Sequence, residues 1–102
     1  VAWRHGGGTL ISYTTPTLGK ITHWILTADG SNMNVYIDGL LDSSTTSAGN
    51  QTGSNALLSI GTYNNGTSEV FGGTVYCVKL YNKVLTANEV LQNHLATKGR
   101  YA

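Results

Sequence analysis

One loop of the sequence holds the residue types that sugar recognition requires. In the polar stretch 62–68, Tyr63 is followed directly by Asn64 and Asn65. An exposed aromatic ring can stack on the apolar face of a sugar, while amides bond its hydroxyls. Asn50 and Asn55, in the polar stretch 42–55, are placed to lie on the same rim. The alternative is that Tyr63 packs under its own loop and the asparagines serve only the turn.

The carboxylates do not suggest hydrolysis. Glycoside hydrolysis needs a pair of Asp or Glu side chains that face each other across a cleft. Asp29 and Asp38 each precede a glycine and are explained by turns, and Glu89 is explained by helix capping. Asp42 and Glu69 remain as two scattered acids in loops. We therefore expect no catalytic residues and predict that the protein is not an enzyme.

The sequence gives little indication of a metal or cofactor. His5, His23 and His94 have no Ser or Cys partner at a recognisable spacing and form no His-x-x-x-His pair. Calcium is the one alternative, with Asp42 and Glu69 as ligands, but such a site needs six or more oxygens. We expect no cofactor and no metal.

Size and composition limit the fold and the partners. A chain of 102 residues with 11% charged residues and 13 glycines suits one domain of short strands joined by turns. A net charge of +1 offers no electrostatic attraction to nucleic acid, and no apolar run is long enough for membrane insertion. The chain begins at Val1 rather than Met, so we expect a processed product or an excised piece of a longer protein.

Alternating apolar residues and turn signals predict an all-β fold. The three glycines at 6–8 are predicted as a loop, and Asp29-Gly30 and Asp38-Gly39 as hairpin turns. Residues 72–85 alternate along one long predicted strand, and Cys77 in its middle is expected to be a buried small hydrophobe rather than a reactive thiol. The predicted strands begin at Thr9, Ile21, Asn34, Leu40, Ala56 and Gly72.

A capping box predicts one helix after the last strand. The Thr86 hydroxyl is expected to accept from the Glu89 amide, and the Glu89 carboxylate from the Thr86 amide. The helix is expected to run to about Ala96, with Gly99 closing it. Its buried side is predicted to consist of Val90, Leu91 and Leu95.

These residues together resemble a known family. Residues 19–30 and 35–39 (Val-Tyr-Ile-Asp-Gly) resemble the central hairpin of laminin-G-like, concanavalin-A-like jelly rolls. Residues 58–61 and 71–75 are similar to the family's next strands, and residues 79–90 to its closing "R-I-Y-N-R-A-L-T-x-x-E-I" motif. One departure is that the usual Trp falls at Ile21, with Trp24 three residues later.

The resemblance implies an antiparallel β-sandwich of the laminin-G-like jelly-roll type, spanning residues 1–102 as a single domain, with one short C-terminal helix. It implies a non-catalytic recognition or adhesion module, extracellular or virion-associated, that binds carbohydrate on a cell or particle surface. The alternative is a structural or assembly domain of a virion or phage tail. Family domains have more strands before the hairpin, so we expect a homo-oligomer or the C-terminal part of a longer domain.

Overall fold

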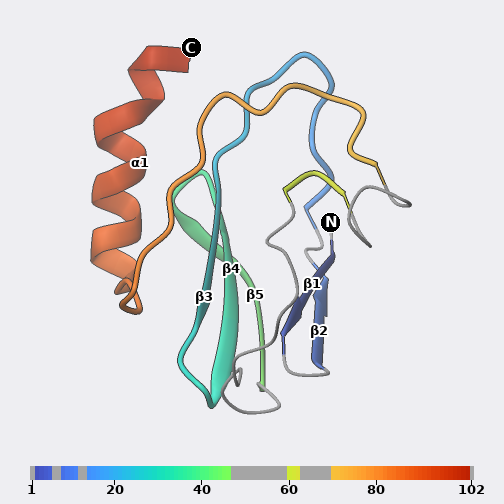
Figure 1. The fold of residues 1–102 in the computed structure, drawn as a ribbon. Coiled ribbons are helices and arrows are strands. Elements are labelled where there is room, and N and C mark those ends of the chain that lie inside the picture. The colour runs from blue at the N-terminus through green and yellow to red at the C-terminus, as the bar shows by residue number, and fades with distance from the viewer. Residues whose placement is uncertain (1, 6–7, 12–13, 47–59, 63–69, 102) are drawn as a thin grey trace. The chain divides into compact units, whose positions relative to one another are not determined.

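A computed structural model describes residues 2–5, 8–11, 14–46, 60–62 and 70–101 (Figure 1). The chain divides into two compact units, one formed by Val1–Gln51 with Lys83–Ala102 and the other by Thr52–Asn82. In the first unit, β1 and β2 pair antiparallel, and β3, β4 and β5 form an antiparallel sheet in that order. The elements are β1 (Ala2–His5), β2 (Gly8–Ile11), β3 (Trp24–Ala28), β4 (Asn32–Ile37), β5 (Leu40–Thr46) and α1 (Ala87–Tyr101). The predicted antiparallel strands with one C-terminal helix are therefore present, and a full sandwich lies beyond what the described residues show.

Both predicted Asp-Gly turns join neighbouring strands of the three-stranded sheet. Asp29 Oδ1 accepts hydrogen bonds from the amides of Ser31 at 2.8 Å and Asn32 at 2.6 Å, and these bonds, the Asn32 bond foremost, lower the pKa of Asp29. In the second turn, Asp38 has a φ of 50° and Gly39 a φ of 85°. Two successive positive φ values are typical of a type I′ hairpin turn, which explains the sequence Asp-Gly there.

The strand after the second turn is longer than the sequence predicted. β5 runs to Thr46, through polar residues that the sequence placed in a loop. Its register with β4 shifts between Val35, which faces Ser43, and Tyr36, which faces Leu41. Asp42 is thus an extra residue, a β-bulge, and lies in a strand rather than in the expected loop.

The three-stranded sheet has apolar side chains on both faces because neighbouring residues of a strand point to opposite sides. On one face, Met33 and Val35 are fully buried, with Leu26 of β3 opposite Val35 and packed against them. On the other face, Tyr36 of β4 and Ile25 of β3 pack against Leu85 and Val90. The helix therefore covers one face of the sheet.

Helix α1 begins as predicted. The Glu89 amide donates to Thr86 Oγ1 at 3.2 Å, and the Thr86 amide donates to Glu89 Oε1 at 3.3 Å, so the capping box is confirmed. Lys83 makes a 2.7 Å ion pair with Glu89, and this contact and then the Thr86 amide lower the pKa of Glu89.

Two expectations about the helix are wrong. The helix continues past Ala96 to Tyr101 and includes Gly99, since one glycine in a last turn costs only about 1 kcal/mol relative to alanine. Val90 is buried as expected, but Leu91 is 36% exposed and Leu95 is 52% exposed. The contact with the sheet is therefore narrower than the apolar side of the helix.

In the second unit, the described residues are 60–62 and 70–82. The Phe71 amide donates to the Gly61 carbonyl at 2.7 Å, and no strand is present between residues 70 and 82. The prediction of a long strand is not met there, because a strand needs a hydrogen-bonded partner. The predicted strand that precedes it, residues 56–61, lies almost entirely outside the described residues.

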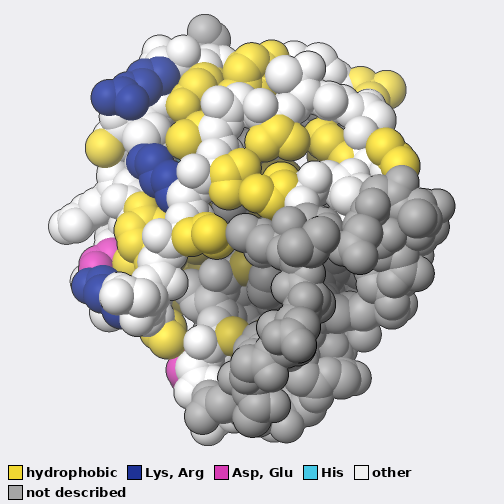
Figure 2. Space-filling model, viewed as in Figure 1, with side chains coloured by type: hydrophobic (Ala, Val, Ile, Leu, Met, Phe, Trp, Pro, Cys, Tyr) yellow, Lys and Arg dark blue, Asp and Glu magenta, His cyan; other side chains and the backbone are white. Residues whose placement is uncertain are grey.

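The same segment corrects the prediction for Cys77, which is exposed rather than buried. Its apolar neighbours also reach the surface: Val75 is 50% exposed and Leu80 is 74% exposed. Alternating apolar residues are buried only where they form a strand that another layer of the fold covers. Residues 70–82 form no strand. Figure 2 shows hydrophobic side chains on the described part of the face it draws, together with Lys, Arg and acidic side chains.

Candidate functional site

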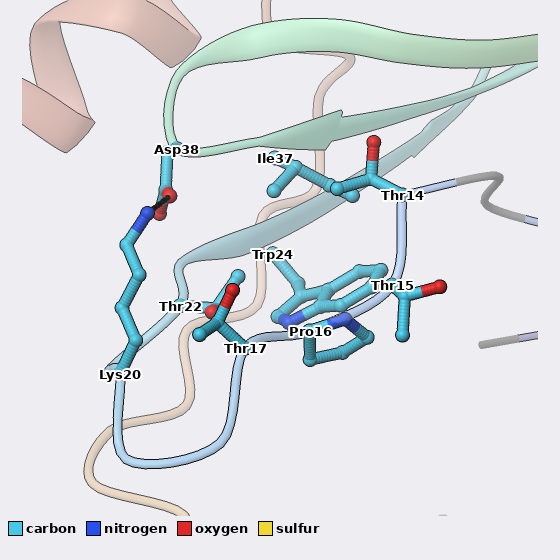
Figure 3. A pocket seen from close by; sticks show the side chains of 9 residues that line it. All are labelled: Thr14, Thr15, Pro16, Thr17, Lys20, Thr22, Trp24, Ile37 and Asp38. Carbon is cyan, nitrogen blue, oxygen red and sulfur yellow. Dashed lines mark hydrogen bonds and ion pairs between the residues drawn. The ribbon is translucent and has the colours of Figure 1, made fainter.

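A hollow of about 50 Å³ lies beside the Asp38-Gly39 turn, where residues 14–22 pass the start of β3 and the end of β4 (Figure 3). Its lining is polar on one side and apolar on the other. Four threonines lie on the polar side, and one lysine and one aspartate contribute charges. The lining residues are Thr14, Thr15, Pro16, Thr17, Lys20, Thr22, Trp24, Ile37 and Asp38.

The apolar side of the hollow is part of the sheet itself. Trp24 begins β3 and faces Ile37 at the end of β4. Both side chains are half-buried and pack against the buried Met33 and Val35. Figure 3 shows the Trp24 indole and the Pro16 ring away from the charged end of the hollow. Trp24 thus both packs against the core and lines the hollow.

The charged end is the ion pair between Lys20 and Asp38. Lys20 Nζ lies 3.1 Å from Asp38 Oδ2, and the lysine side chain is 61% exposed. The other carboxylate oxygen, Asp38 Oδ1, accepts from the His23 amide at 3.0 Å, and the Asp38 amide donates to the His23 carbonyl at 2.9 Å. Asp38 is therefore held by three bonds and keeps its carboxylate turned to the hollow.

The pKa of Asp38 follows from these contacts. Burial alone would raise the pKa, because it disfavours the charged form. The His23 amide, the Lys20 ammonium and the charge of His94 outweigh burial and lower the pKa below its ordinary value. The group is therefore a carboxylate, an acceptor of hydrogen bonds, across the neutral and mildly acidic range.

The loop that forms the rest of the hollow is fixed at two points. The Thr14 hydroxyl donates to Asp42 Oδ1 on the bulge of β5, and Ser43 Oγ donates to Asp42 Oδ2 at 2.8 Å. Further along, the Lys20 amide donates to the Thr17 carbonyl at 3.1 Å, and Gly19 has a φ of 80°. This four-residue turn needs glycine at its third position and directs Lys20 back toward Asp38.

Behind the hollow, the Asp38-Gly39 turn supports the helix. The rings of His23 and His94 stack with centroids 5.6 Å apart and planes at 21°. The Nδ1 atoms of both rings are buried. A Cβ added at Gly39 would lie 3.1 Å from His94 Cβ and 3.1 Å from Leu91 Cδ1. The absence of a side chain at Gly39 thus allows α1 to approach this closely.

The predicted binding residues Tyr63, Asn64, Asn65, Asn50 and Asn55 all lie outside the described residues. Their grouping on one rim therefore stays a prediction.

The hollow was missed by sequence reasoning. The sequence explains Asp38 by its turn, which is correct, and distinguishes Trp24 only as lying three residues after the position of the family's usual Trp. The signal in the sequence that could have indicated the hollow is Gly19-Lys20, because a turn at Gly19 directs the Lys20 side chain toward the β3–β4 pair.

Comparison with known families decides the classification. A family model described as "Concanavalin A-like lectin/glucanases superfamily" matches residues 1–91. The chain belongs to this superfamily. Its hairpin of β3 and β4, its Asp38-Gly39 turn and the segment leading to α1 all fall inside the matched range, so the resemblance predicted from the sequence is confirmed.

A solved structure supports the fold of this superfamily member. The chain is similar to an S-layer domain-containing protein (residues 221–444) from Clostridium thermocellum ATCC 27405, with a TM-score of 0.65 and 18% identity. The alignment covers 85% of this chain and 45% of that one, so the chain spans less than half the length of its structural relative. A search of curated proteins found no match.

Among the described residues, no three His, Cys, Asp or Glu side chains gather into a group that would hold a metal ion. Of the described carboxylates, Asp29 closes a turn, Glu89 caps the helix and Asp42 holds the Thr14 loop. Within the described part of the chain, the one helix is too short and polar to cross a membrane.

Proposed function

We propose that the protein is a non-catalytic recognition module of a cell surface that binds carbohydrate. The observation that carries the proposal is the hollow, which is lined by an indole, a lysine, a carboxylate and threonines. Sugars are bound by this combination of an apolar ring face and directional hydrogen bonds. Membership of a superfamily of lectins and glucanases supports the choice of ligand.

Two further observations support a surface location without catalysis. The structural relative carries an S-layer domain in its name, and we propose a cell-surface or extracellular setting for this chain as well. Each of the four carboxylates among the described residues holds a turn, a loop or a helix end. These residues are Asp29, Asp38, Asp42 and Glu89. Carboxylates occupied in this way are poorly suited to act as a general acid and its partner.

The predicted rim of Tyr63, Asn64, Asn65, Asn50 and Asn55 belongs to the same proposal as a second contact region. Tyr63→Ala is expected to weaken glycan binding by about 1–3 kcal/mol, the range for losing a buried aromatic contact, with little change in thermal unfolding. The measurement is a glycan array followed by titration calorimetry with the best ligand. An array on which the wild-type protein binds no glycan would overturn the carbohydrate proposal.

A second candidate function is assembly with other protein subunits. It is favoured by the exposed apolar side chains of residues 70–82, among them Phe71, Tyr76 and Leu80. Apolar surface of this kind is commonly covered by a partner. A structural domain of a surface layer or virion, a homo-oligomer or a longer sandwich would each cover it. Sedimentation of the protein at micromolar concentration separates these cases from a free monomer.

A further inference from the structure

We infer that the hollow beside Trp24 binds a single neutral sugar ring, and that the Lys20–Asp38 ion pair recognises two adjacent hydroxyls of that ring. The inference rests on the proposed function and makes it specific, because it assigns a ligand class and three contact residues. None of these residues belongs to the rim predicted from the sequence.

The size of the hollow limits the ligand. A volume of about 50 Å³ is well below the roughly 300–1,000 Å³ of pockets that enclose drug-sized ligands. The hollow can therefore enclose only the edge of one sugar ring, and the rest of that ring, with any chain attached to it, would extend into solvent.

The ion pair supplies the donor and the acceptor that a pair of hydroxyls needs. Lys20 has three N–H donors, and its contact with Asp38 uses one of them. The Asp38 carboxylate has about four acceptor positions, and the His23 amide and Lys20 use two. The two charged atoms are 3.1 Å apart. Hydroxyls on neighbouring ring carbons have a similar spacing, so one can accept from Lys20 while the other donates to Asp38.

The charge of the hollow selects against acidic sugars. Lys20 and Asp38 carry opposite charges, and no other charged residue lines the hollow. A uronate that approached Lys20 would meet the Asp38 carboxylate at the same place, and like charges at contact distance repel. A neutral ring meets no such repulsion and gains bonds from both members of the pair.

Trp24 completes the site from the opposite side. Its indole is half-buried against the core, and Figure 3 shows it across the hollow from the ion pair, beside Pro16. An aromatic ring held by the core loses little conformational freedom on binding. The C–H face of a sugar whose hydroxyls contact Lys20 and Asp38 would be turned toward this indole.

The test is a nuclear magnetic resonance titration of the full chain with methyl α-mannopyranoside, methyl α-glucopyranoside, methyl α-galactopyranoside and sodium glucuronate. The Trp24 indole N–H and the His23 amide, which bonds Asp38, report on the two sides of the hollow. The inference expects at least one neutral hexoside to shift both signals and to bind at least tenfold more tightly than glucuronate.

Two substitutions that preserve the fold sharpen the test. Asp38→Asn keeps an acceptor for the His23 amide and tolerates the positive φ of the turn, and Lys20→Met keeps the aliphatic stem. Each is expected to weaken hexoside binding by about 10- to 100-fold, as for loss of a hydrogen bond to a charged group. Lys98→Met, at an exposed lysine of α1 that does not line the hollow, is the matched control and should bind as the wild type does.

The outcomes separate this inference from the proposed function. If the wild type binds array glycans but the Asp38 and Lys20 variants bind equally well, the hollow is not the site and the inference fails while carbohydrate binding stands. Tighter binding of glucuronate than of every hexoside would also overturn it. If the wild type binds no glycan at all, the proposed function is wrong, and the inference that rests on it is wrong as well.

Discussion

Replacing Gly39 by alanine tests whether the helix rests on the Asp38-Gly39 turn. Gly39 has a φ of 85°, and a left-handed conformation costs an L-residue about 1–2 kcal/mol. The new Cβ would also lie 3.1 Å from His94 Cβ and 3.1 Å from Leu91 Cδ1, closer than ordinary van der Waals contact. Overpacking of this kind costs about 1–3 kcal/mol. Gly39→Ala is therefore expected to lower the free energy of unfolding by about 2–5 kcal/mol.

Gly19→Ala is the matched control. Gly19 has a φ of 80°, and a Cβ there would meet nothing within 4 Å. It carries the conformational cost alone, about 1–2 kcal/mol. The difference between the two variants thus isolates the contact with α1.

The assay is urea unfolding of the full chain, followed by circular dichroism at a helix-sensitive wavelength. At this chain length, each 1 kcal/mol also lowers the melting temperature by about 4–8 °C. We expect Gly39→Ala to be less stable than Gly19→Ala by about 1–3 kcal/mol. Equal destabilisation by the two substitutions would refute the close contact between the turn and the helix.

Three further outcomes are expected. Thr86→Ala should lower the free energy of unfolding by about 1 kcal/mol, whereas Thr86→Ser, which keeps the hydroxyl, should change it little; an unchanged urea midpoint for alanine would contradict the capping box. Val90→Ala should cost about 2–3 kcal/mol through two lost methyl groups and the cavity they leave, and the same unfolding assay checks it. The lowered pKa of Asp38 means that its contribution to stability is present above the pKa of the unfolded chain and is lost as pH falls through the lower folded value. Unfolding measured from pH 7 to pH 2 should therefore show Asp38→Asn less stable than the wild type at neutral pH, with the difference shrinking in acid.

The features that the sequence predicted well are those fixed by neighbours along the chain. An Asp-Gly pair between apolar runs specifies a turn through its own φ preferences, and both turns are present. Thr86 and Glu89 are three residues apart, so their reciprocal bonds follow from helix geometry alone. Residues 24–28 and 32–37 pair in the register that the turn between them sets.

The features that the sequence predicted badly depend on distant parts of the chain. Cys77 and its neighbours alternate like a strand, but alternation does not say which segment pairs with them or covers them. Leu91 and Leu95 lie on the apolar side of α1, yet of this side only Val90 is buried. In the hollow, Lys20 contacts Asp38, which lies 18 residues further along the chain. Each polar group there has a local explanation in the sequence, and that explanation does not show that the groups line one hollow.

The bulge at Asp42 has a consequence for how β5 meets other molecules. β5 is the last strand of its three-stranded sheet, and a terminal strand exposes a row of N–H and C=O groups on which a foreign strand can pair. The extra residue breaks the even spacing of that row and increases the local twist. It also prevents β5 from sliding along β4 by one residue, since a slip would have to move the bulge and the Thr14 hydroxyl bonded to it. Asp42 thereby makes this edge a poor template for pairing with a foreign strand.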